Sequence, residues 1–244
     1  MNESVIQVRG LCVQFGRKVV LDGLDLDVPR GSVTALVGRN GVGKSTLLRV
    51  LVGALEPDAG RAAVLGVDPA RDGVRARALV GYVPDHIDVP AWMRGCDWLA
   101  FVRNFYPTWG AKEQARWIDV LELDADTRVS EMSKGARTKL ALVSALAHAP
   151  QVLLLDEPFS GLDASARNAI TTAVLTSLRD EARTVLLVSH SIPDVERLAD
   201  RVAVMSDGRV ETFGDLEELA RSERGGIDLE ALLLADSPVR ESVR

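Results

Sequence analysis

One segment of the chain has the residue types and spacing of a phosphate-binding loop. Residues 38–46 read GRNGVGKST, which fits the pattern G-x-x-x-x-G-K-[ST]. Glycines allow positive φ angles and carry no Cβ, so several backbone N–H groups can converge on a phosphate. An apolar run precedes the loop and a stretch with helical spacing follows it, which argues against a chance glycine-rich turn. The segment predicts a nucleoside triphosphate site formed by Gly38, Asn40, Gly41, Gly43, Lys44, Ser45 and Thr46.

Two side chains of this loop have distinct chemical tasks. Lys44 can reach the β- and γ-phosphates of a nucleotide, and the Ser45 hydroxyl can ligate Mg²⁺. A helix that begins near Gly43 adds the positive end of its dipole beside the phosphates. We therefore expect Lys44 to act in catalysis as well as in binding.

Acidic residues and a histidine follow two further apolar runs. Residues 152–155 lead directly into Asp156 and Glu157, and residues 184–188 are followed closely by His190. The carboxyl ends of parallel strands form the ligand-binding edge of a sheet. There Asp156 can hold Mg²⁺ through its water shell, and Glu157 can act as general base on an attacking water. The alternatives are a solvated strand end with two charges and a histidine on the surface or in the core.

The elements that position these residues follow from the hydrophobic pattern. Alternating residues at 5–9 and 24–28 are typical of antiparallel strands with one solvent-facing side. The run 152–155 is wholly apolar, and the runs 33–37 and 184–188 are apolar except for one threonine each, as in buried parallel strands. Helical spacing follows these runs at 44–52, 164–179 and 193–200. Strands that alternate with helices predict an α/β fold with a parallel sheet.

Other parts of the chain have different patterns. Residues from about 85 to 150 have helical spacing and no β-branched run, so we expect an all-helical insertion. Residues 201–213 predict a hairpin with its turn at Asp207-Gly208. The tail from Asp215 has eight acidic and four basic residues, and one helical stretch is expected near 229–234.

Composition narrows the protein class. The 244 residues suit one large domain or a domain with a subdomain. A net charge of −6 argues against general binding to nucleic acid or anionic lipid. Cys12 and Cys96 have no paired spacing, so neither a disulfide framework nor a zinc site is expected. The first residues lack a signal-peptide pattern and the longest apolar runs are far below ~18 residues, which predicts a cytoplasmic chain without direct membrane insertion.

Together the motifs resemble the ATP-binding subunit of ABC transporters. Residues 38–46 match Walker A, 152–157 match Walker B, 160–163 (SGLD) match the D-loop, and His190 matches the switch histidine. The resemblance runs over about residues 4–214, in the order of the family. It implies ATP hydrolysis, with ATP and Mg²⁺ as cofactors.

The resemblance also implies an architecture. This is an α/β fold with a RecA-like P-loop NTPase core, an N-terminal antiparallel β subdomain and an inserted helical subdomain. An ABC ATPase domain is then expected over 1–214, with the helical subdomain at about 85–150. A short acidic C-terminal tail occupies 215–244.

Further roles follow from the resemblance. Phe15 matches the aromatic residue that stacks on adenine, although packing in a half-buried strand also accounts for it. Ser133 and Gly135 lie where the family has its Leu-Ser-Gly-Gly-Gln signature, and Asp163 lies in the D-loop. In the family, the signature of one subunit closes on the ATP held by another. These residues predict a second ATPase subunit, in a homodimer or a heterodimer, and Ser133 is also a suitable helix N-cap.

Two places depart from the family pattern. Lys134 and Ala136 replace a glycine and a glutamine of the signature, and Lys134 either adds a cation near the γ-phosphate or points to solvent. Asp85 stands where the Q-loop ends in glutamine. A carboxylate keeps an oxygen suited to Mg²⁺, but it adds charge and loses the amide donors. We expect Asp85 to join Ser45 and Asp156 as a metal ligand in an active enzyme, with an altered link to the membrane partner.

All four tryptophans fall in one short segment, as Trp92, Trp98, Trp109 and Trp117. A small helical subdomain needs bulky core residues, which accounts for most of them. Alternatively, Trp92 and its neighbours line a groove for a helix of a membrane protein. In the family the region after the Q-loop receives the permease, so 85–109 is the expected contact segment for an integral-membrane permease subunit.

The predicted function is an ATP-hydrolysing motor that drives transport through a separate permease chain, on the inner face of the cell membrane. The run at 105–109 together with 133–135 resembles bacterial subunits that serve exporters of antibiotics, peptides or lipids, which favours export. One alternative is a soluble ABC-type ATPase not engaged in transport, although such proteins usually carry tandem halves, coiled coils or zinc modules. Another is a P-loop small-molecule kinase, which does not account for Ser133, Asp163 and His190 together.

Overall fold

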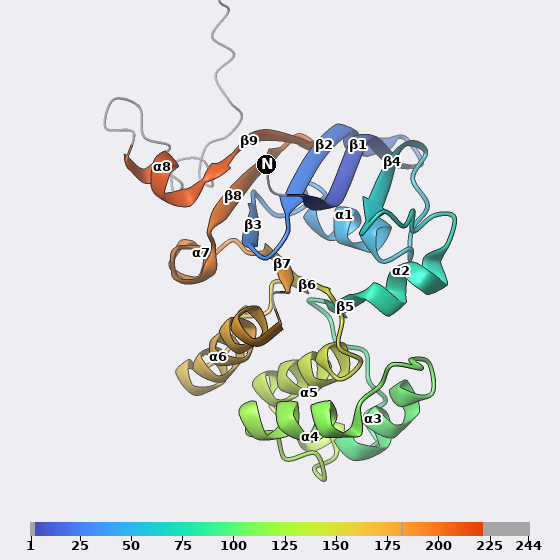
Figure 1. Cartoon of the computed structure of the whole chain (residues 1–244), viewed down its shortest axis with the longest axis vertical. Helices are drawn as coiled ribbons and strands as arrows, with labels where there is room; N and C mark the ends of the chain where they lie inside the picture. The colour runs from blue at the N-terminus through green and yellow to red at the C-terminus, as the bar shows by residue number, and fades with distance from the viewer. Residues whose placement is uncertain (1–2, 182, 222–244) are drawn as a thin grey trace, which may run out of the picture.

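The strands of this protein form two sheets (Figure 1). The structure is a computed structural model that describes residues 3–181 and 183–221, so the helical stretch expected near 229–234 lies outside the described residues. The smaller, antiparallel sheet has the order β2-β1-β4, with strands β1 (Ser4–Phe15), β2 (Lys18–Pro29) and β4 (Ala59–Val64). The larger sheet has the order β5-β6-β7-β3-β8-β9. Its strands are β3 (Val33–Val37), β5 (Val80–Val83), β6 (Val152–Asp156), β7 (Thr184–Val188), β8 (Arg201–Ser206) and β9 (Arg209–Asp215).

Five strands of the larger sheet are parallel, and only its edge strand β9 runs antiparallel to its neighbour β8. The helices between the strands are α1 (Lys44–Leu51), α2 (Gly73–Leu79), α3 (Gly95–Arg103), α4 (Ala111–Val120), α5 (Lys134–Leu146), α6 (Ala164–Glu181) and α7 (Ile192–Leu198), with a 3₁₀ turn η1 (Val129–Glu131). Helix α8 (Leu216–Arg221) follows β9. Among the described residues, no helix is long and apolar enough to cross a membrane.

The central strands β3, β6 and β7 are buried on both faces, which explains why nearly all of their residues are apolar. In β6, Val152 and Leu154 pack into a core shared with α1 and the smaller sheet, whereas Leu153 and Leu155 pack into a core shared with α4, α5 and α6. Successive side chains of a strand point to opposite faces, so both faces of β6 must be covered. Helix α1 covers one face, and a helical layer made of α4, α5 and α6 covers the other (Figure 1).

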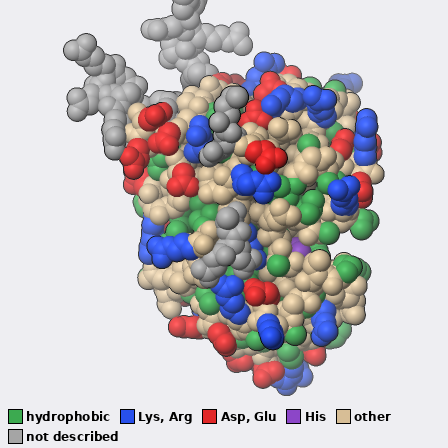
Figure 2. All heavy atoms as spheres, in the orientation of Figure 1, with side chains coloured by type: hydrophobic (Ala, Val, Ile, Leu, Met, Phe, Trp, Pro, Cys, Tyr) green, Lys and Arg blue, Asp and Glu red, His purple; other side chains and the backbone are tan. Residues whose placement is uncertain are grey.

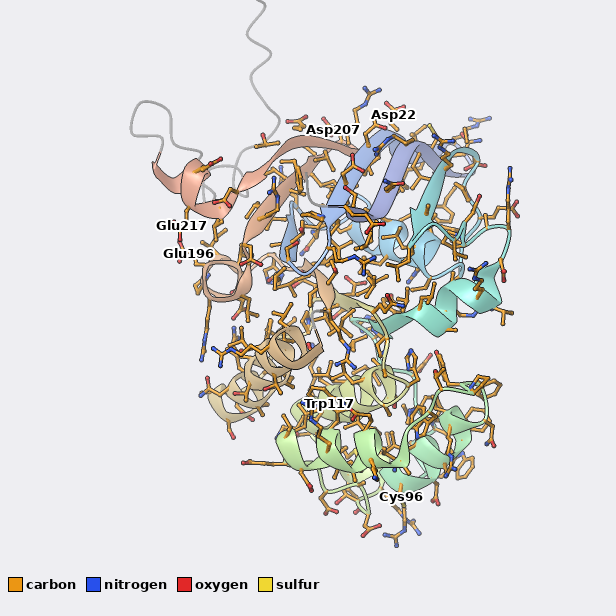
Figure 3. The ribbon with its side chains drawn as sticks, in the orientation of Figure 1. Asp22, Cys96, Trp117, Glu196, Asp207 and Glu217 are labelled. Atoms are coloured by element: carbon orange, nitrogen blue, oxygen red, sulfur yellow. The ribbon has the colours of Figure 1, made fainter. Side chains whose placement is uncertain are left out.

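The four tryptophans divide between core and surface. Trp117 is fully buried in the helical layer (Figure 3), and Trp109 is nearly buried, with its Nε1 donating to Gln114 Oε1 at 2.9 Å. Trp98 is partly buried, whereas Trp92 is 75% exposed in the loop before α3. The prediction that most of the tryptophans are core residues therefore holds for Trp109 and Trp117, whereas Trp92 lies outside the core.

The predicted hairpin is confirmed, and its turn also joins the two sheets. Asp207 and Gly208 both have positive φ angles, as a two-residue hairpin turn requires. The Gly208 carbonyl accepts a hydrogen bond from the Asp22 backbone N–H at 3.1 Å, and Arg209 forms an ion pair with the Asp22 carboxylate at 2.7 Å. Asp22 and Asp207 are labelled at this junction in Figure 3. A Cβ at position 208 would lie 2.6 Å from the Val20 carbonyl, so only glycine allows this approach.

Candidate nucleotide site

The phosphate loop lies between the end of β3 and the start of α1. Gly38, Gly41 and Gly43 have φ angles of +155°, +83° and +112°, which other residues rarely adopt. A Cβ at Gly43 would lie 2.7 Å from the Leu21 side chain, and one at Gly38 would overlap the Met205 carbonyl. Glycine at 38 and 43 is therefore required both by the φ angle and by the space available.

Lys44 is held inside this loop. Its Nζ donates to the Gly38 carbonyl at 2.6 Å and to the Arg39 carbonyl at 2.9 Å, and the side chain is almost fully buried. Burial lowers the pKa of Lys44, while the negative charges of Glu157 and Asp156 act in the opposite direction. The loop thus positions one ammonium group beside two carboxylates.

A cavity of about 290 Å³ opens beside the loop and unites most of the residues predicted from the sequence. It is lined by Lys18, Val20, Asn40, Gly41, Gly43, Lys44, Ser45, Thr46, Asp85, Asp156, Glu157 and Val188. Phe15 does not line it; this half-exposed ring is at the end of β1, opposite Lys18 in the register of the smaller sheet. Lys18 is a cavity residue that the sequence does not identify, because nothing in its local pattern shows which side chains it will contact.

The carboxyl end of β6 contributes the acidic wall of the cavity. The Ser45 hydroxyl donates to Asp156 Oδ1 at 3.1 Å, so the loop and the strand end are in direct contact. Burial raises the pKa of Asp156, the charges of Asp85 and Glu157 raise it further, and the Ser45 hydrogen bond and Lys44 oppose the shift. A cation placed among these oxygens would stabilise the ionised Asp156.

Glu157 and His190 form a close pair at the same edge of the sheet. His190 Nδ1 lies 2.7 Å from Glu157 Oε2, whereas Glu157 Oε1 is buried without a hydrogen-bond partner among the described residues. Glu157 has a φ of +49°, a left-handed conformation that costs a non-glycine residue about 1–2 kcal/mol. Its backbone N–H donates to the Val188 carbonyl at 3.0 Å, which ties it to the neighbouring strand. One carboxylate oxygen is thus held by the imidazole and the other is free to accept a proton.

The residues of the signature segment lie elsewhere. The Ser133 hydroxyl accepts from the Ala136 N–H at 3.1 Å and caps α5, as predicted, and Asp163 Oδ1 accepts from the Ala166 N–H at 2.8 Å at the start of α6. A Cβ at Gly135 would lie 2.6 Å from the Ala166 Cβ, so glycine permits the close packing of α5 on α6. Ser133 and Asp163 line a separate cavity of about 300 Å³, and neither lines the nucleotide cavity of the same chain.

The two departures from the family pattern meet in a third cavity. Asp85 and Lys134 both line a space of about 480 Å³ between the loop after β5 and the first turn of α5, together with Asp88 and Arg137. Asp85 also lines the nucleotide cavity, so it stands between the two spaces. Lys134 extends toward the D-loop, since its Nζ would lie 3.6 Å from a Cβ on Gly161.

Known proteins match this chain in both sequence and fold. Residues 21–160 match the family model described as "ABC transporter". The chain is 37% identical to the daunorubicin resistance ATP-binding protein DrrA3 of Streptomyces coeruleorubidus, over 96% of this chain and 75% of the relative. It is 38% identical to the sulfate/thiosulfate import ATP-binding protein CysA of Bradyrhizobium diazoefficiens (89% of this chain, 65% of the relative). Nod factor export ATP-binding protein I of Paraburkholderia xenovorans also shows 38% identity, over 92% of this chain and 75% of the relative.

Solved structures confirm the predicted fold. A structure described as an ATP-binding subunit of an ABC transporter superposes with a TM-score of 0.84 at 25% identity, over 95% of this chain and 100% of that chain. A dimeric ATP-binding cassette bound to ADP and Pi superposes with a TM-score of 0.77 at 20% identity, over 86% of this chain and 98% of that chain. The antiparallel β subdomain and the mixed α/β core are those of an ABC ATPase. The chain therefore belongs to the ABC transporter family, in which it is an ATP-binding subunit that hydrolyses ATP to drive transport.

Proposed function

We propose that this chain powers export through a separate integral-membrane permease, using ATP hydrolysed in the cavity between the phosphate loop and the end of β6. The proposal of ATP hydrolysis at this site rests on one observation: a single cavity is lined by Lys44, Ser45, Asp156 and Glu157. Export is supported by the relatives named for drug resistance and Nod factor export, although a sulfate importer is similarly related. The permease would hold the chain at the inner face of the cell membrane.

The proposed catalytic roles follow from the geometry. The loop N–H groups and Lys44 bind the β- and γ-phosphates. Glu157 Oε1, which is buried and has no hydrogen-bond partner among the described residues, accepts a proton from the attacking water. His190 holds the other oxygen of Glu157 at 2.7 Å and so orients the base. Phe15 is proposed to stack on the adenine beside Lys18.

The residues of the site fit Mg²⁺. Within the described part of the chain, no three Asp, Glu, His or Cys side chains converge as a metal-binding group. Mg²⁺ in nucleotide sites is bound by one or two protein oxygens, water and phosphate oxygens, which suits the adjacent Ser45 and Asp156. When bound, the ion neutralises charge on the phosphates. Asp85 is proposed as a further oxygen donor, since it lines the same cavity.

Removing the Asp85 carboxylate tests that assignment. We expect Asp85→Ala to raise the Mg²⁺ concentration for half-maximal ATPase activity about tenfold, because a supporting oxygen is lost. Asp85→Gln keeps an oxygen and should show a smaller increase. Asp88→Asn is the matched control, since Asp88 is on the same loop but does not line the nucleotide cavity. Parental Mg²⁺ dependence in both Asp85 variants would rule out the assignment.

A second ATPase subunit is part of the proposal. Ser133 and Asp163 line a cavity other than the nucleotide cavity of their own chain, so a role for them at a γ-phosphate requires ATP held by another subunit. The N-terminus of α5, capped by Ser133, would direct its N–H groups at that phosphate. Either a second copy or a homologous subunit meets this requirement.

The proposed permease contact is the segment 85–109. Its exposed aromatic side chains are Trp92 in the loop before α3, Phe101 on α3 and Phe105 after it, and the ring centroids of Phe101 and Phe105 lie 5.2 Å apart. Exposed clustered aromatics are typical of protein interfaces. On the face shown in Figure 2, Lys and Arg side chains alternate with Asp and Glu side chains, which does not favour a nucleic-acid partner.

Truncating two of these aromatics tests the contact. We expect Trp92→Ala and Phe105→Ala each to lower recovery of the permease with this chain from detergent-solubilised membranes by at least tenfold, because exposed aromatic anchors carry much of an interface energy. Basal ATPase activity should stay unchanged, because neither residue lines the nucleotide cavity. Val74→Ala on α2, with Val74 equally exposed at 76%, is the control. An equal loss in the Val74 variant, or no loss in the aromatic variants, contradicts the assignment.

A further inference from the structure

An ion pair outside the nucleotide cavity joins the helices that follow Glu157 and His190. Arg167, in the first turn of α6, donates from Nη1 to both carboxylate oxygens of Asp194 on α7, at 2.6 and 2.7 Å. The Asp194 side chain is 7% exposed and that of Arg167 is 33% exposed. The pair is therefore largely shielded from solvent, unlike most ion pairs on the surface of the protein.

The same guanidinium reaches a third acceptor. Arg167 Nη2 donates to the Phe159 carbonyl at 3.4 Å, and the backbone N–H of Arg167 donates to the Asp163 carbonyl at 3.0 Å. Phe159 is two residues after Glu157, and Asp194 is four residues after His190. Arg167 therefore contacts both the segment that follows Glu157, at Phe159, and the helix that follows His190, at Asp194.

Stability alone does not explain this arrangement. A shielded ion pair contributes little to folding compared with apolar residues of the same volume, because both charges lose their hydration. The planar fork of arginine presents donors on separate nitrogen atoms in a fixed geometry, so Nη1 can bind the carboxylate while Nη2 binds the carbonyl; lysine has a single nitrogen on a flexible stem. Glu157 also has a backbone conformation that must be maintained by its surroundings, since it has a positive φ.

We propose that Arg167 is a positioning residue for ATP hydrolysis: through Phe159 and Asp194 it fixes the distance between Glu157 and His190. The inference rests on the proposed role of Glu157 as general base. A displacement of about 1 Å in a catalytic group can lower a rate about 100-fold. Arg167 and Asp194 do not line the nucleotide cavity, so their loss should affect turnover and leave ATP binding intact.

The test compares kcat and KM for ATP in variants of the full chain. We expect Arg167→Ala and Asp194→Asn to lower kcat about 10- to 100-fold while KM changes less than about twofold. Asp194→Glu keeps the carboxylate and should recover most of the lost rate. Arg197→Ala is the matched control, because Arg197 joins the same two helices through Asn168 at 3.2 Å but does not contact the Phe159 segment. Its kcat should equal that of the parent.

The inference is overturned if Arg167→Ala retains the parental kcat, or if Arg197→Ala loses as much activity. Should Arg167→Ala fail to fold, Arg167→Lys decides the matter, since it keeps the cation without the fork; parental kcat in that variant overturns the proposal. Glu157→Gln is measured alongside. Parental hydrolysis by Glu157→Gln would refute the role of Glu157 itself, whereas an inactive Glu157→Gln with fully active Arg167 variants would refute only the positioning role.

Discussion

Glu157→Gln is expected to lower kcat for ATP hydrolysis by about 10²- to 10⁴-fold, the range associated with loss of general-base catalysis. An amide has nearly the same shape as a carboxylate, but its oxygen is a very weak base and cannot take a proton from water. Glu157 lines the cavity and its Oε1 has no hydrogen-bond partner among the described residues, so the replacement removes the proposed proton acceptor without opening space. Phosphate release at saturating Mg-ATP measures the effect.

The affinity for ATP should remain within about twofold of the parent in the same variant, because the phosphate loop is intact. Titration with a fluorescent ATP analogue measures this separately from turnover. Glu196→Gln makes the same chemical change at an exposed position on α7 (Figure 3) and should have parental activity. Unchanged phosphate release by Glu157→Gln would remove Glu157 from the account.

Lys44→Ala is expected to weaken ATP binding about 100-fold. The ammonium is fixed by two loop carbonyls, so it is preorganised for the phosphates, and loss of a charged hydrogen bond costs about 2–3 kcal/mol. Each 1.4 kcal/mol corresponds to about a factor of ten in affinity. Equilibrium titration with nucleotide gives the dissociation constants of the parent and the variant.

Lys18→Ala provides the control for charge alone, because Lys18 lines the same cavity but is exposed. Its effect on affinity should be at most about threefold, as for a screened surface charge. Thermal unfolding of Lys44→Ala should stay close to that of the parent, since burial disfavours the Lys44 ammonium and alanine removes that cost. Parental ATP affinity in Lys44→Ala would contradict the proposed phosphate contact.

Much of the nucleotide site could be predicted because its chemistry is encoded in short motifs beside apolar strands. The loop at 38–46, the acids after β6 and His190 after β7 each follow a run that is buried on both faces, and such runs end at one edge of a parallel sheet. Strand β4 was not predicted, because its sequence AGRAAV has little β-propensity and it is held by pairing with the distant β1.

Side chains that act through tertiary contacts were missed. Neither Arg167 nor Asp194 belongs to an apolar pattern or to a recognised motif, and their pairing joins positions 27 residues apart. A weak signal was available: Arg167 is four residues after Asp163, and Asp194 is four residues after His190, so each lies one helical turn beyond a predicted site residue. The sequence does not show that these two turns face each other.

The tryptophans at 92–117 and the two departures from the family pattern, at Asp85 and Lys134, also have surroundings that the sequence does not predict. Trp92 and Trp117 are the same residue type, yet Trp92 is exposed and Trp117 is fully buried. Their difference arises from tertiary packing. Asp85 and Lys134 are 49 positions apart and were interpreted separately, although they line one cavity in the fold. Charges that line one cavity are expected to influence each other.

We propose that this chain transfers the γ-phosphoryl group of ATP to water activated by Glu157. This proposal is tested most directly by incubating the purified chain with Mg-ATP in water enriched in ¹⁸O, with no other acceptor, and analysing the released phosphate by mass spectrometry. We expect free phosphate that carries an oxygen from the labelled water, with formation strongly reduced in Glu157→Gln. No phosphate without an added acceptor, or release that is unaffected by Glu157→Gln, would contradict it.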